Sequence, residues 1–163
     1  MIIDFLARYW VELLASICGS TGFCLFFHVK RDKLIFGVIG GIISIVVLFI
    51  CDDFEMPIII QNMIAAMAAT LYSEIIARIV KAPATVFIIS SIIPLTPGGS
   101  LYYTMSAVVD ADAKAFETMG AKTGLTALGI ALGIVLISVI FYQINHRDVK
   151  QKVNYQKYAK GEK

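Results

Sequence analysis

The chain has 163 residues, of which 58% are hydrophobic and 16% charged, with a mean hydropathy of +0.80 and a formal net charge of +2. Ordinary soluble domains carry about 25% charged residues, and a soluble protein of this length could not bury so much apolar surface. The composition therefore excludes a soluble domain. It predicts an all-α, polytopic membrane protein that forms one compact domain.

Apolar runs that are long enough, or nearly long enough, to cross a bilayer occur five times along the chain. They predict transmembrane helices at about 9–28, 34–51, 57–80, 84–109 and 122–144. We interpret residues 1–145 as a five-span membrane domain and residues 146–163 as a basic cytoplasmic tail. The first run lacks the basic leading segment of a cleavable signal, so we expect it to be a retained span.

Basic residues gather on alternate connections between these runs. The connection at 29–33, the connection at 81–83 with the adjacent Arg78, and the tail together hold eleven of the fourteen Lys and Arg residues. The intervening connections, 52–56 and 110–121, are acidic. Because positively charged loops remain in the cytoplasm, this pattern predicts an external N-terminus and a cytoplasmic C-terminus.

Small residues recur four positions apart in several predicted spans, as in Gly37 and Gly41 or Gly129 and Gly133. This spacing lets helices approach each other closely in lipid. We interpret these positions as packing grooves within the molecule, with a self-dimerisation face as the alternative.

The fourth run is interrupted at its centre by two prolines and two glycines between Pro94 and Gly99. Proline removes a backbone donor and ends or kinks a helix. Unpaired backbone groups at this depth are tolerated only where they are buried in protein or line an aqueous cavity. The pattern therefore predicts a broken fourth helix at Pro94–Gly99 and a transport or conduction site. A plain proline kink in a structural helix is the alternative.

The break also has the features of an anion site. We expect the first half-helix to end near Ile92 or Ile93, and Thr96 to cap a second half-helix whose first residue is Pro97. Backbone N–H groups would then point into the break, where a helix N-terminus favours a carboxylate. The predicted substrate-binding residues are Pro94, Thr96, Pro97, Gly98, Gly99, Ser100 and Tyr103, with Ser90 and Ser91 as additional donors.

Glu74 and Arg78 are the charged residues of the third run, four positions apart on one helix face. Intramembrane carboxylates are functional candidates. Glu74 is therefore either an ion-coupling group or the acidic partner in a structural Glu74–Arg78 pair, and the sequence leaves both readings open. Hydrolase, kinase, metal-site and dinucleotide motifs do not occur. We expect no enzyme, no metal, no cofactor and no binding of nucleic acid.

Two stretches resemble a known family: Ala77–Phe87, which reads ARIVKAPATVF, and Ile92–Gly99, which reads IIPLTPGG. The chain resembles the threonine/serine exporter family over nearly its whole length, and specifically its small, YjjB-like five-span subunit. Members of that family often carry Pro-Gly where this chain has Ser90 and Ser91, so this part of the break is expected to differ here.

The resemblance implies that the chain corresponds to the C-terminal half of single-chain exporters of the ThrE type. A separate, larger five-span subunit would supply the other half, and both would lie in the plasma membrane of a bacterium. The implied function is export of a small carboxylate-bearing solute, threonine or serine first, by alternating access. The alternatives are a subunit of a dicarboxylate (succinate-type) exporter, a non-transporting membrane scaffold, and a channel.

Overall fold

The computed structural model describes residues 2–28 and 30–159, with side chains from 10 to 28, at 30, and from 32 to 144. Every element in this described part is helical, which confirms the all-α prediction. The elements are α1 (Ile2–Phe26), α2 (Arg31–Asp53), α3 (Ile58–Val80), α4 (Ala84–Ile92), the single 3₁₀ turn η1 (Ile93–Leu95), α5 (Gly98–Val109) and α6 (Ala113–Ala159).

Three of the described helices are long and apolar enough to cross a membrane, namely Asp32–Asp53, Ile58–Val80 and Ala113–Ile144. The pair Ala84–Leu95 and Gly98–Val109 passes the same test together and is bent by 58°. The described apolar part of α1, Trp10–Phe26, is shorter. The fold is therefore that of a polytopic membrane protein with three to four candidate spans, one of them broken.

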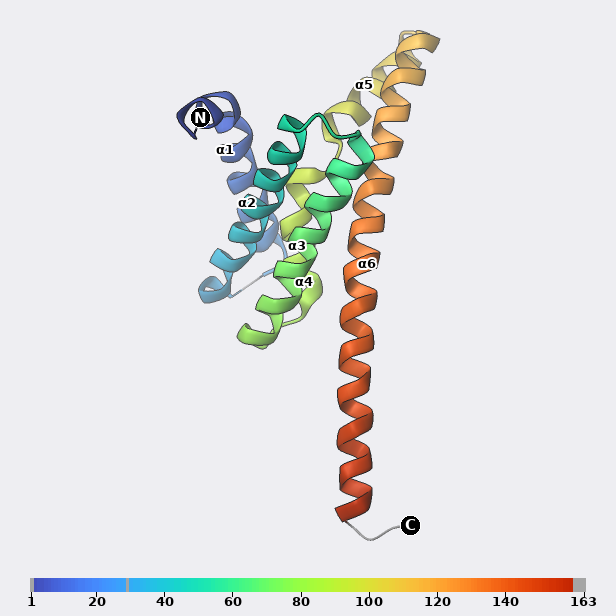
Figure 1. The fold of residues 1–163 in the computed structure, drawn as a ribbon. Helices are drawn as coiled ribbons and strands as arrows, with labels where there is room; N and C mark the ends of the chain where they lie inside the picture. Colours follow the sequence, from blue (N-terminus) through green and yellow to red (C-terminus); the bar gives the residue numbers. More distant parts are fainter. Residues whose placement is uncertain (1, 29, 160–163) are drawn as a thin grey trace.

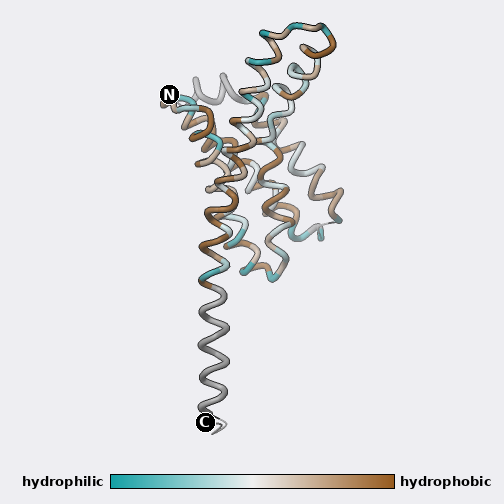
Figure 2. Tube along the Cα trace, turned by 90° about the vertical axis from the view of Figure 1, so that its right-hand side faces the viewer, coloured by the Kyte–Doolittle hydropathy of each residue, from teal (hydrophilic) through white to brown (hydrophobic). Residues whose placement is uncertain are grey.

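The connections gather at two ends of the helical bundle (Figure 1). At one end, Nζ of Lys33 donates a hydrogen bond of 2.8 Å to the carbonyl of Val80, which joins the start of α2 to the end of α3. At the other end, Nε2 of Gln61 contacts Oδ1 of Asp52 at 3.3 Å, beside the connection from α2 to α3. The basic and acidic connections thus lie at opposite ends. Hydrophobic residues occupy the helices between them (Figure 2).

Helix α6 differs from its predicted boundaries at its start. Most of the predicted connection over 110–121 is helical, because α6 begins at Ala113. Oδ1 of Asp112 accepts the backbone N–H groups of Lys114 and Ala115 at 3.1 and 3.0 Å and so caps this helix. No proline lies between Ala113 and Ala159 to stop the helix.

The same helix continues beyond 144, through most of the predicted tail, and Figure 1 shows it running past the ends of α3 and α4. The side chains of that tail, including its basic residues, lie outside the described ones.

Small residues form close helix contacts inside this chain. A Cβ atom placed on Gly129 or Gly133 of α6 would lie 2.5 Å from a backbone carbonyl oxygen of α3, that of Ile59 or Met63 respectively. The interpretation of these glycines as packing grooves is therefore confirmed. Beside this contact lies the main apolar core: Ala65, Ala66, Ala69, Ile92, Leu95 and Ile130.

Candidate functional site

The fourth apolar run is broken where the sequence predicts it. Helix α4 ends at Ile92, η1 covers one turn, and α5 begins at Gly98 after a bend of 58°. The turn η1 packs against α1 and α2 (Figure 1), and Leu95 in it is only 3% exposed. The break is therefore supported by neighbouring helices on one side.

Thr96 does not cap α5, so that part of the prediction is wrong. Its hydroxyl donates to the carbonyl of Ile93 at 2.6 Å, and its own N–H bonds the same oxygen at 3.2 Å. Pro97 stands at the N-cap position instead. The physical reason is local competition, because Pro97 offers no N–H to the Ile93 carbonyl and the Thr96 side chain takes that place.

The start of α5 keeps part of the predicted set of free donors. The N–H of Gly98 is not free, because it bonds the carbonyl of Thr96 at 2.8 Å in a tight turn about Pro97. Among the described residues, the N–H groups of Gly99 and Ser100 have no backbone partner. The hydroxyl of Ser100 turns back to the carbonyl of Pro97 at 3.2 Å.

Gly98 and Gly99 are exposed, and a Cβ atom on either would meet nothing within 4 Å. Neither has a positive φ angle. Backbone strain and packing within this chain therefore do not explain why glycine occupies both positions. Tyr103 lies one turn along α5 from Gly99, is 60% exposed, and packs its ring edge-on against that of Tyr102 at 5.5 Å.

A buried cluster of hydroxyl groups and glycines, which the sequence patterns described above do not predict, lies behind the break. We call it the serine–glycine cluster. It is built from four helices, with Ser73 and Ser91 in contact at 3.2 Å between their Oγ atoms and Ser20 bonded to the carbonyl of Ser90 at 2.9 Å. Its members are Ser16, Ser20, Gly37, Gly40, Gly41, Ser44, Ser73, Ser90 and Ser91.

The cluster corrects the expectation that Ser90 and Ser91 supply donors to a ligand. Both are at most 1% exposed and are bonded to groups of this chain. Their side chains face the packed interior, because glycines on α2 leave room for them there. A sequence signal for the cluster does exist: Ser16 and Ser20 lie four positions apart, the spacing of close helix contacts in membranes.

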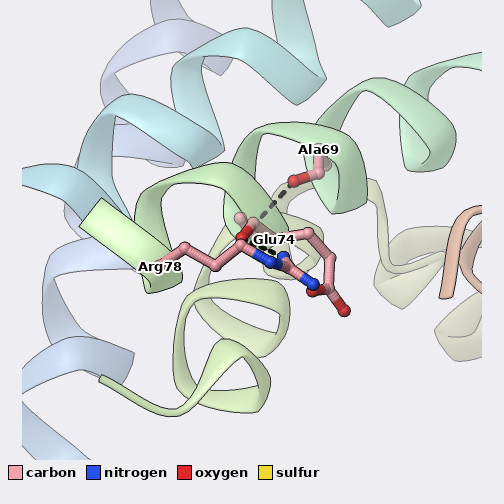
Figure 3. Close-up of polar contacts among 4 residues, drawn as sticks. Ala69, Glu74 and Arg78 are labelled. Carbon is pink, nitrogen blue, oxygen red and sulfur yellow. Dashed lines mark hydrogen bonds and ion pairs between the residues drawn. The ribbon is translucent and has the colours of Figure 1, made fainter. Parts of the chain in front are cut away.

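Glu74 and Arg78 form the predicted pair (Figure 3). Oε2 of Glu74 lies 2.7 Å from Nη1 of Arg78, and the two side chains are 14% and 47% exposed. The Arg78 guanidinium also lies 4.5 Å from the centre of the Phe141 ring of α6. The carboxylate is thus mostly shielded, and its partner sits over an aromatic face, where a cation is stabilised.

Residues 12–140 match the family model described as "Threonine/Serine exporter, ThrE". The match covers both the broken helix and the Glu74–Arg78 pair. Comparison with curated proteins and with solved structures finds no match in either set.

Proposed function

We propose that this chain, which belongs to the threonine/serine exporter ThrE family, is the membrane subunit of a secondary exporter of small carboxylate-bearing solutes, threonine or serine first. Family membership makes it a membrane transporter rather than an enzyme. The proposal adds the nature of the subunit, the binding site and the mechanism.

The main evidence for a binding site is the exposed N-terminus of α5. Two exposed glycines stand there without a steric reason in this chain, and two N–H groups lack backbone partners among the described residues. The positive end of a helix dipole favours a negative group at this place. Bare backbone also allows that group to come within hydrogen-bond distance. A solute carboxylate fits this chemistry within the segment Thr96 to Ser100, held by the N–H groups of Gly99 and Ser100, with Pro94 shaping the break and Tyr103 one turn away.

A larger five-span partner subunit would complete the site. Helix α5 packs on α6, and among the described residues no other helix packs on it to a comparable extent. Together α5 and the start of α6 expose seven large apolar residues: Leu101, Tyr102, Tyr103, Met105, Val108, Val109 and Phe116. Lipid or a second subunit must cover these side chains. A carboxylate site at the edge of such a surface needs a second wall to exclude lipid, and alternating access requires that wall to move.

We further propose five spans, with α1 as the first, an external N-terminus and a cytoplasmic C-terminus in the plasma membrane of a bacterium. The separation of basic and acidic connections at opposite ends supports this orientation. An impermeant thiol reagent added from outside should label a cysteine at Asp53 and spare one at Lys30. The reverse labelling would overturn the orientation.

The function is tested by solute efflux from cells that carry or lack this gene and the gene of the partner. We expect saturable efflux of threonine or serine that needs both genes and collapses when the ion gradient is removed. Efflux of four-carbon dicarboxylates alone would identify these as the solute in place of threonine and serine. Flux without saturation or gradient dependence would indicate a channel. No efflux of any of these solutes would favour a scaffold subunit.

The Glu74→Gln variant tests whether the carboxylate couples export to an ion gradient. We expect it to insert normally and to lose at least about nine-tenths of gradient-driven efflux, because the amide keeps the shape but removes the charge that a cation or proton needs. The measurement is the initial efflux rate with and without an imposed gradient. Arg78→Gln is the matched control, since it breaks the same ion pair and leaves the carboxylate. Equal losses in both variants would assign the pair a structural role.

A further inference from the structure

The carbonyl of Ser90 lacks the backbone donor that a continuous helix would provide. Its donor would be the N–H of the residue four positions later, which is Pro94 and has none. The preceding bond of the ladder is intact, because the N–H of Ile93 reaches the carbonyl of Ile89. An unpaired carbonyl away from water is costly in a membrane protein. Helix α4 therefore needs a donor from another element at this point.

Ser20 of α1 provides that donor. Its hydroxyl donates to the Ser90 carbonyl at 2.9 Å, and the two residues are 0% and 1% exposed. The hydroxyl of Ser90 does not compete, because it bonds the carbonyls of Val86 and Phe87 at 3.0 and 3.1 Å within its own helix. A residue 70 positions earlier in the chain thus satisfies the group that the proline leaves open.

Two glycines, one on α2 and one on α1, allow these helices to pack closely against the break around this hydrogen bond. Gly41 of α2 lets the Ser20 hydroxyl approach, because a Cβ atom there would overlap Oγ of Ser20 and lie 3.5 Å from Cγ of Pro94. Gly19, the neighbour of Ser20, would place a Cβ atom 3.5 Å from Cγ2 of Ile93. Helices α1 and α2 therefore meet the break through backbone and hydroxyl groups, at close range.

We propose that Ser20 is a positioning residue for the broken helix. By bonding the Ser90 carbonyl it fixes the last turn of α4, and so sets the direction in which η1 and the start of α5 leave that turn. The inference rests on the proposed function in one respect, namely that the start of α5 binds the solute. Ser20 itself is buried behind the break and acts through Ser90.

The first test compares two backgrounds, because the Pro94→Ala substitution restores the backbone N–H that the Ser90 carbonyl lacks. Spin labels on cysteines at Thr85 and Met105, two exposed positions on α4 and α5, report the distance across the bend. We expect Ser20→Ala to broaden or shift this distance distribution when Pro94 is present. In the Pro94→Ala protein the same change should have no effect, because the backbone then supplies the donor.

In the labelled protein, alanine replaces the native cysteines Cys18, Cys24 and Cys51. The full chain is used, together with its partner subunit if efflux requires one. Ser16→Ala is the matched control. Ser16 is also buried on α1 and donates to a carbonyl, that of Gly41 at 3.1 Å. Gly41, however, lies inside the continuous helix α2, so we expect the Ser16 variant to leave the bend unchanged.

An unchanged distance in Ser20→Ala, or the same change with and without Pro94, would overturn the proposal. So would an equal effect of Ser16→Ala. If Ser20→Ala alone yields no folded protein, the Pro94→Ala background should restore folding, because the backbone then supplies the donor. Failure to fold in that background as well would overturn the proposal. Since these distances do not depend on the solute, their outcome stands even if the proposed substrate is wrong.

The second test measures export at a series of solute concentrations. We expect Ser20→Ala to raise the half-saturating concentration about three- to tenfold, in the range of one lost interhelical hydrogen bond, with the maximal rate much less affected. A fall in maximal rate that only follows the amount of protein in the membrane would indicate a structural role alone. The Ser16→Ala control should keep the wild-type half-saturating concentration.

Discussion

Replacing Gly99 with leucine should reduce export to the level of cells that lack the gene. The side chain would occupy the space through which a carboxylate approaches the N–H groups at the start of α5. Its Cβ would meet no atom of the described residues within 4 Å. Insertion and folding should therefore persist. Initial efflux rates, normalised to the protein present in the membrane, measure the effect. Gly98→Leu is expected to behave in the same way, and Gly99→Ala to give an intermediate rate.

A matched control separates this effect from the general cost of a bulky residue on a helix. Gly124 of α6 is also exposed and has open space around it, so Gly124→Leu should export normally. Co-purification of the partner subunit gives a second readout. Loss of export with the partner still bound supports a solute site, and loss of the partner assigns the two glycines to the subunit interface. Normal export by Gly99→Leu would show that the proposed site is wrong.

Replacing Gly40 with alanine should destabilise the folded chain more than any other small change in the serine–glycine cluster. A Cβ atom there would overlap the hydroxyl of Ser91 and lie 2.9 Å from its Cβ, with Cδ1 of Tyr72 at 3.2 Å. Ser91 cannot move freely, because it is fully buried and contacts Ser73. We expect a loss of about 1–3 kcal/mol, the usual range for overpacking a dense core, seen as a lower melting temperature of the purified protein.

A compensating substitution that removes volume from the neighbouring residue tests whether overpacking causes this loss of stability. Ser91→Gly removes the two Ser91 atoms that the new methyl group meets and leaves the wider contact with Cδ1 of Tyr72 at 3.2 Å. Ser73 keeps its own bond to the carbonyl of Ala69 at 2.7 Å. The double variant Gly40→Ala with Ser91→Gly should therefore recover most of the stability. Gly22→Ala on α1, where nothing lies within 4 Å of the Cβ position, should be neutral or slightly stabilising, since alanine is the better helix former. A melting temperature unchanged by Gly40→Ala would contradict this account.

Features that depend on neighbouring residues along the chain were predictable from the sequence. The break at Pro94 follows from a missing N–H, which no packing can restore. The contact between Glu74 and Arg78 follows from their spacing of four positions on one helix. The continuous start of α6 is less predictable, because residues 113–121 combine charged and polar side chains, typical of a connection, with good helix formers and a preceding capping aspartate.

Hydroxyl groups were the least predictable part of the site. A serine or threonine in a helix can bond its own backbone or a neighbouring helix, and both choices occur here. Thr96 bonds back to Ile93 instead of capping α5, and Ser20 reaches across to Ser90. Local spacing cannot distinguish these outcomes, because each depends on which carbonyl another element leaves open.

By itself the sequence determined the membrane class, the approximate positions of the apolar helices and the place where the fourth one breaks. These follow from composition, from the length of apolar runs and from proline chemistry, all of which act within a few residues. Only the tertiary structure decided which helices support the break. The support is a hydroxyl group of α1 that donates to a carbonyl of α4, beside a glycine of α2 that leaves room for it. Such a contact exists only after segments that are distant in the sequence have packed together, at a distance that leaves no space for a larger side chain.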